Sequence, residues 1–229
     1  MIMLNILKNK NIYVVLIFLL SFFVIWPLLR SGYFSHQDDL QVIRIVEMRK
    51  CFADFQIPCR WVSDMGWGNG YPLFNYYGVF TYYLGGLVSY MFNYLVTAKI
   101  LFGIALVFGS FGIYYFVSKL FDNKLAGFVS SVLYLFAPYK ALDVYVRGAL
   151  GESMALAIIP FVFYFLLSLF DKKDQNSKKQ KKYFILFVLS LFVFLTTHNI
   201  ITLVFLPVLI AFSLYLLIVN KFFNLKLII

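Results

Sequence analysis

The chain has 229 residues, of which 62% are hydrophobic, and its mean hydropathy is +0.85. A soluble domain of this length cannot cover that much apolar surface, so the composition excludes an ordinary soluble protein and indicates an integral membrane protein. The formal net charge is +10, which we ascribe to lysines in cytoplasmic loops. No basic patch with interleaved aromatic residues is present, so we expect no nucleic acid partner.

The chain begins with a short basic leader at residues 1–10, and residues 11–29 are apolar and long enough to form a first span. A cleaved signal peptide is the alternative, but the apolar run is too long and lacks the small-residue cleavage pattern. Residues 30–98 are predicted to form an external loop that contains helices lying on the membrane surface. The remaining spans are expected within residues 100–219, in five apolar segments: 100–117, 125–139, 149–170, 183–197 and 200–219.

Two segments of the external loop carry helical patterns. Residues 38–55 alternate apolar and charged side chains, which is typical of a surface helix. Residues 78–96 are long enough to span but rich in tyrosine, which favours a helix at the interface.

Charge limits the possible topologies without deciding between six and seven spans, and the family resemblance described below favours six. Residues 171–182 contain six lysines, so we place this loop in the cytoplasm. It falls there if the N-terminus is cytoplasmic, the tyrosine-rich segment stays outside and the chain has six spans. A seven-span model with an external N-terminus also places it inside, but scatters the polar loops over both faces. We therefore predict an all-α, multi-pass helix bundle of about six transmembrane helices in the cell membrane, with seven as the alternative.

Cys51 and Cys59 are the two cysteines of the chain. A disulfide on an oxidising face is one interpretation, and two free thiols is the one that we favour. Their spacing is not typical of a metal site.

The first polar cluster follows the first span and contains His36, Asp38 and Asp39. Adjacent carboxylates can hold a divalent cation such as Mg²⁺ or Mn²⁺, or one of them can act as a general base. The alternative is that an aspartate caps the helix that follows. We predict His36, Asp38 and Asp39 as catalytic residues, and the two aspartates as metal ligands.

Two further clusters lie near the ends of later spans. Asp143, Arg147 and Glu152 follow the break at Pro138, and a guanidinium offers a fork of donors to phosphate oxygens. A structural Arg147–Glu152 pair is equally compatible with this spacing. The third cluster contains His198 and Asn199, for which a polar turn at the headgroup level is the alternative.

Aromatic residues gather in the external loop, and their flat faces pack well on sugar rings and on isoprenoid chains. We predict that Arg60, Trp61 and Tyr71 bind substrate, although an interfacial belt also explains most of this set. The set comprises Trp61, Trp67, Tyr71, Phe74, Tyr76 and Tyr77.

Several runs together resemble a bacterial and archaeal family, the 6-pyruvoyl-tetrahydropterin synthase-related membrane proteins. They are residues 56–61, 66–77, 82–85, 137–139, 143–149 with Glu152, and 197–199. That family in turn is similar, more loosely, to the N-terminal part of the C-type membrane glycosyltransferases.

This second resemblance implies an enzyme that takes a sugar from a polyprenyl-phosphate carrier at the outer membrane face and transfers it to a glycan, lipid or protein acceptor. By position, Asp38 or Asp39 would be the general base on the acceptor, and Arg147 would face the carrier phosphate. Glu152 and His198 would be secondary site residues. Such enzymes are longer, so the resemblance predicts that this chain is the N-terminal part of a larger architecture.

Two other functions are compatible with the sequence. A transporter or flippase for a lipid-linked substrate would use Arg147 and Glu152 to line a pathway, although no internal repeat is evident. A non-catalytic, truncated membrane subunit would also fit the short length.

Overall fold

The computed structural model describes residues 12–33, 35–171 and 177–220. These residues form helices and loops, and within them the only β-type pairing is an isolated bridge between Val62 and Tyr71. The predicted basic leader and the middle of the lysine-rich loop lie outside the described residues.

Five helices are long and apolar enough to cross a membrane, and a bent pair brings the number to six. The bent pair consists of α7 (Lys124–Leu135) and the segment Pro138–Arg147, which meet at 43°. The prediction of a multi-pass helical membrane protein is therefore confirmed. The five are α2 (Ile12–Ile25) with its 3₁₀ extension η1 (Trp26–Leu29), α6 (Tyr94–Leu120), α9 (Leu150–Leu169), α10 (Ser177–Thr197) and α11 (Asn199–Val219).

The tyrosine-rich segment does not span. Its helix, α5 (Phe80–Val88), has nine residues, whereas a transmembrane helix needs about 20. The next helix, α6, begins at Tyr94, where the Asn93 side chain accepts a hydrogen bond from the Val96 amide at 2.8 Å. The loop that the sequence predicts to be external therefore ends at Asn93 rather than at residue 98, and it keeps the name external loop after that prediction.

The span predicted over residues 125–139 is bent, and its helical segments extend to Arg147. Helix α7 ends at Leu135, and Pro138 begins α8 (Pro138–Ala141), which continues into the π-helical η2 (Leu142–Arg147). A proline disfavours the helical conformation of the residue before it and is well suited to the start of a helix. The chain therefore bends at Ala137 and Pro138. η2 then ends at Gly148, whose φ of +65° favours glycine.

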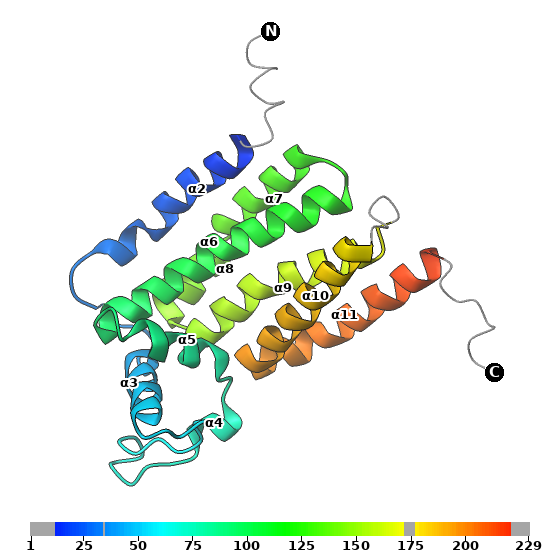
Figure 1. Ribbon diagram of the computed structural model, residues 1–229. Coiled ribbons are helices and arrows are strands. Elements are labelled where there is room, and N and C mark those ends of the chain that lie inside the picture. The colour runs from blue at the N-terminus through cyan, green and yellow to red at the C-terminus, as the bar shows by residue number, and fades with distance from the viewer. Residues whose placement is uncertain (1–11, 34, 172–176, 221–229) are drawn as a thin grey trace, which may run out of the picture.

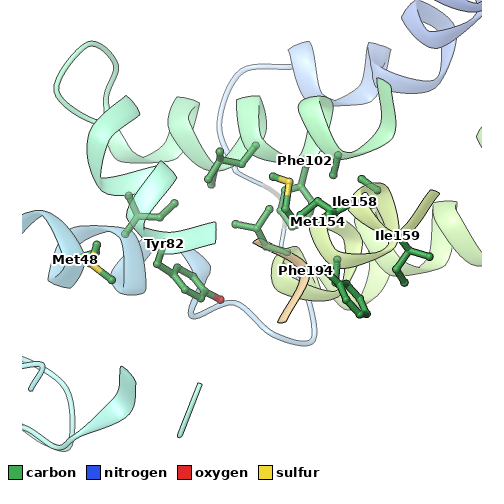
Figure 2. Packing of buried hydrophobic residues seen from close by; sticks show 14 of the residues in the cluster. Met48, Tyr82, Phe102, Met154, Ile158, Ile159 and Phe194 are labelled. Atoms are coloured by element: carbon green, nitrogen blue, oxygen red, sulfur yellow. The ribbon is translucent and has the colours of Figure 1, made fainter. Parts of the chain in front are cut away.

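Helix α9 is the centre of the bundle. Figure 1 shows it between α6 and α10, and 72% of its span is buried, against 11% for α10 and for α11. Figure 2 shows Met154, Ile158 and Ile159 of α9 packed near Phe102 and Phe194.

The external loop gathers α3 (Gln41–Ala53), α4 (Leu73–Tyr76) and α5 at one end of the bundle, opposite the α6–α7 turn (Figure 1). Helix α3 packs closely on α5. A Cβ added to Gly85 would lie 2.9 Å from Ile45 Cγ1, and one added to Gly86 would lie 2.7 Å from Phe52 Cε2.

Helix α3 forms within the predicted residues 38–55, and it buries polar side chains together with its apolar ones. Gln41, Arg44 and Glu47 are buried together with Ile45 and Met48. Their polar partners lie in the external loop and at Gly148, which a count of apolar positions does not reveal.

Cys51 and Cys59 form a disulfide, so the preference for free thiols is wrong. The chain reverses after α3 at Phe55, which has a φ of +55°. This turn brings the two Cα atoms to 5.6 Å. The disulfide ties the end of α3 to the hairpin that carries the Val62–Tyr71 bridge.

Candidate functional site

The first polar cluster lies directly against the end of η2. The Gln37 amide donates to the Val146 carbonyl at 3.0 Å, and the Asp38 amide donates to the Arg147 carbonyl at 2.9 Å. His36 covers Gly148, where an added Cβ would lie 2.5 Å from the His36 Cβ. Two segments more than 100 residues apart in sequence are therefore joined through their main chains.

The Asp38 carboxylate is held by two side chains of α3. Its Oδ2 accepts hydrogen bonds from Gln41 Nε2 at 2.8 Å and from Arg44 Nη1 at 2.9 Å. The capping interpretation is wrong, because the N-cap position is Leu40 and no side chain caps α3. Asp38 Oδ1 accepts no hydrogen bond from the residues that the structure describes, and the side chain is about one-third exposed. Asp39 is exposed.

Arg44 and Gln41 connect Asp38 to the rest of the external loop. Arg44 Nη1 lies 3.2 Å from the Tyr77 hydroxyl, and the guanidinium lies 4.5 Å from the centre of the Tyr77 ring. Gln41 Oε1 accepts a hydrogen bond from the Tyr82 hydroxyl at 2.7 Å, and its Nε2 donates to the Gly148 carbonyl at 2.8 Å.

Sequence reasoning missed this network. Asp38 and Gln41, and Gln41 and Arg44, are each three positions apart, and this spacing was the available signal. Tyr77 and Tyr82 had no such signal, because their contacts with α3 span more than 30 residues.

Arg147 is the centre of the second cluster. Its Nη2 donates to Glu152 Oε2 at 2.8 Å, and its Nη1 lies 3.1 Å from both Asp143 Oδ1 and the Tyr139 hydroxyl. The predicted Arg147–Glu152 pair is confirmed. Asp143 is fully buried and also accepts a hydrogen bond from Ser153. The Arg147 side chain remains 37% exposed, so it is fixed in direction but open to a ligand.

The third cluster joins the same end of the bundle. His198 caps α11, and its Nδ1 accepts a hydrogen bond from the Ile201 amide at 3.2 Å. Its ring lies beside the start of α9, because a Cβ on Gly151 would be 3.4 Å from His198 Cδ2. Asn199 Nδ2 donates to the Tyr76 carbonyl at 2.7 Å, which ties the turn to α4.

Burial lowers the pKa of both histidines. For His198, loss of solvent opposes the charged form, while the nearby Glu152 carboxylate favours it and Arg147 opposes it. For His36, burial lowers the pKa and Asp38 acts in the opposite direction.

The three clusters therefore converge. Arg44 binds both the Asp38 carboxylate and the Tyr77 hydroxyl, and Asn199 donates to the carbonyl of the neighbouring Tyr76. The Asp38 amide donates to the Arg147 carbonyl, which joins the first cluster to the second. Glu152 completes the connection, because it binds Arg147 directly and lies close enough to act on His198. Together these residues form a partly open polar site at one end of an apolar bundle. The site contains the Asp38 and Glu152 carboxylates and the Arg147 guanidinium.

Arg60, Trp61 and Tyr71 lie in a separate hairpin. Val62 and Tyr71 exchange two main-chain hydrogen bonds of 3.1 Å, and the amides of Arg60 and Trp61 both donate to Gln56 Oε1 at 2.8 Å. Figure 1 shows this loop projecting beyond α3 and α4. The structure does not bring these three residues to Arg147 or His198, and their role in substrate binding stays a prediction.

The sequence predicts a divalent cation at Asp38 and Asp39. The described part of the chain contains no group of three or more histidine, cysteine, aspartate or glutamate residues placed to bind a metal. Asp38 Oδ2 is taken up by Arg44 and Gln41, and Asp39 is exposed. Binding of Mg²⁺ or Mn²⁺ at these two aspartates therefore stays a prediction.

Comparisons with known proteins give one match. A family model described as the 6-pyruvoyl-tetrahydropterin synthase related domain, a membrane protein, matches residues 74–228. The match contains Arg147, Glu152 and His198 but begins after Asp38. No curated protein and no solved structure matches. Since the model covers more than half of the chain, the protein belongs to the 6-pyruvoyl-tetrahydropterin synthase related family of membrane proteins.

Proposed function

We propose that this chain is a membrane glycosyltransferase, or the N-terminal module of one. It would transfer a sugar from a polyprenyl-phosphate carrier to a glycan, lipid or protein acceptor. The observation that carries the proposal is the main-chain junction between the Asp38 and Arg147 segments. One segment carries a carboxylate with one open oxygen, and the other carries an oriented, partly exposed guanidinium.

The chemistry requires a base and an anion-binding group near each other. The acceptor hydroxyl attacks the anomeric carbon and gives its proton to Asp38 Oδ1. The bond between that carbon and the phosphate oxygen breaks, and its electron pair leaves with the carrier phosphate. Arg147 balances the charge on the phosphate, since a guanidinium binds phosphate oxygens through a fork of donors.

The surrounding residues position these two groups. Glu152 and Asp143 fix the direction of Arg147 while leaving part of its donor set unused. Arg44 and Gln41 hold Asp38 by one oxygen only. His198 lies beside Glu152 and closes the site next to α11.

Two observations support an outer-face location. The Cys51–Cys59 disulfide lies at the same end of the molecule as the site, and disulfides persist in oxidising compartments. The lysine-rich start of α10 lies at the opposite end (Figure 1), as the positive-inside rule expects for the cytoplasmic side.

A flippase for a lipid-linked substrate is the second candidate. The bend between α7 and η2 resembles the broken helices that transporters use at their binding sites. A flippase would move the carrier without breaking the sugar–phosphate bond. Release of free carrier phosphate would therefore indicate a glycosyltransferase, and its absence a flippase.

Binding of undecaprenyl phosphate to the purified full chain in detergent tests the proposal. We expect it to bind more tightly than undecaprenol, and Arg147→Lys to weaken this preference about tenfold, because a point charge cannot replace the planar fork. Lys181→Gln, which removes a charge at the opposite end, is the control. Equal binding of the two compounds by the wild-type chain would contradict the proposal.

A further inference from the structure

Apart from the polar site, the structure contains a large cavity beside α6. A cavity of about 1130 Å³ opens between η1 and the first half of α6, which is larger than most sites for small molecules. Its walls are mainly apolar. The lining includes Ile25, Leu28, Leu29, Ile100, Ile104 and Phe108.

The two charged residues of the lining, Arg30 and Lys99, are both basic. Lys99 Nζ donates to the Arg30 carbonyl at 2.6 Å and to the Gly32 carbonyl, which holds its ammonium at the rim. Arg30 is exposed. Among the described residues, no carboxylate lines the cavity, so its polar end is unbalanced and suits an anion.

The length of the cavity fits one leaflet of a bilayer. Lys99 and Phe108 are nine positions apart on α6, which corresponds to about 14 Å at 1.5 Å per residue. Half of the hydrocarbon core of a bilayer is about 15 Å. The cavity therefore offers basic groups at headgroup level and apolar walls down to about the middle of the membrane.

We propose that this cavity is a binding site for an anionic phospholipid of the surrounding leaflet, whose phosphate lies at Arg30 and Lys99. Its acyl chain extends along Ile100, Ile104 and Phe108. Arg147, the phosphate partner proposed above, does not line the cavity, so this site is distinct from the carrier site. The inference does not depend on glycosyl transfer.

Gly103 provides a variant that fills the cavity without disturbing the bundle. A Cβ on Gly103 would have one neighbour, Leu28 Cδ1, at 3.9 Å. Gly103→Phe therefore extends into the acyl part of the cavity, whereas Val129→Phe enlarges an exposed position on α7 and serves as its control.

Native mass spectrometry of the full chain, released from detergent in the presence of phosphatidylglycerol or phosphatidylcholine, tests the site. We expect one tightly retained phosphatidylglycerol. The double variant Arg30→Gln/Lys99→Gln should bind it about 25-fold more weakly, since each basic residue near an anionic surface contributes about fivefold. Lys181→Gln/Lys182→Gln removes the same charge from exposed positions at the other end of the bundle and should leave binding unchanged.

Gly103→Phe should abolish retention while keeping the wild-type melting temperature. Three results would overturn the inference: equal retention of the two lipids, equal retention by the charge variant and its control, or a dimer that Gly103→Phe converts to a monomer. The last result would show that a second copy of the chain covers the cavity.

Discussion

At the scale of single residues, the site depends on charges that satisfy one another at the edge of an apolar bundle. The Arg147–Glu152 pair was predictable because both residues follow the same helix break at a spacing of five. The contacts of Arg44 were not predictable, because its partners Asp38 and Tyr77 come from separate parts of the external loop.

Arg44→Gln tests the importance of that missed residue. Arg44 is buried, and its removal leaves Asp38 without its ionic partner. A hydrogen bond to a charged group contributes about 2 kcal/mol, so we expect a lower melting temperature in detergent, measured by tryptophan fluorescence. Lys181→Gln is the control, and a melting temperature equal to wild type would show that Arg44 does not hold the loop.

The lowered pKa of His198 predicts a pH dependence of stability. Because burial lowers the pKa in the folded state, the unfolded state binds a proton first as the pH falls below about 6.5. The contribution of His198 to stability is therefore complete at pH values above the pKa of the unfolded state. It is lost as the pH falls toward the lower pKa of the folded state. Protonation of Nδ1 also removes the cap on α11.

His198→Asn should reduce this dependence, since asparagine caps a helix without titrating. We expect the fall in melting temperature between pH 7.5 and pH 5 to be smaller in the variant than in wild type. His36 contributes to the same fall in both proteins, so their difference isolates His198. Parallel curves would contradict the assignment.

At the scale of elements, hydropathy located the spans but not their ends or breaks. The tyrosine content of residues 78–96 correctly indicated a segment that does not cross. The bend after α7 depends on Pro138 and on the π-helical turn that follows, which the average hydropathy of residues 125–139 does not reveal. The α3–α5 contact depends on Gly85 and Gly86 meeting residues some 35–40 positions away, so no local pattern shows it.

Gly78 joins the external loop to the α10–α11 turn. A Cβ there would lie 2.1 Å from the Thr197 carbonyl oxygen, and a main-chain atom cannot move aside cheaply. We expect Gly78→Ala to cost about 1–3 kcal/mol of stability through overpacking. Gly103→Ala, whose Cβ would meet only Leu28 Cδ1 at 3.9 Å, should be neutral or stabilising. Equal melting temperatures for the two variants would contradict this close contact.

At the scale of the whole molecule, the fold places the three polar clusters at one end and the lysine-rich start of α10 at the other. Charge counting alone left six and seven spans open, whereas the nine-residue length of α5 removes the extra span. The sequence did not predict the disulfide, because its spacing of eight residues does not show the chain reversal at Phe55.

Labelling with a membrane-impermeant maleimide tests the orientation. In a Cys51→Ser/Cys59→Ser background, Trp67→Cys introduces a thiol at the fully exposed tip of the hairpin, and Lys181→Cys introduces one at the opposite end. We expect the first to react in intact cells and the second only after permeabilisation. The reverse pattern would place the site on the cytoplasmic face.

The most direct test of the account is the release of undecaprenyl phosphate from a panel of undecaprenyl-phosphate sugars by the full chain in liposomes, with an acceptor present. We predict release by wild type and a loss of at least about 100-fold in Asp38→Asn/Asp39→Asn, the contribution of a general base. Asp54→Asn, at an exposed position beyond α3, should release carrier at the wild-type rate. Wild-type release by the double variant, or no release by the wild-type chain from any member of the panel, would contradict the account.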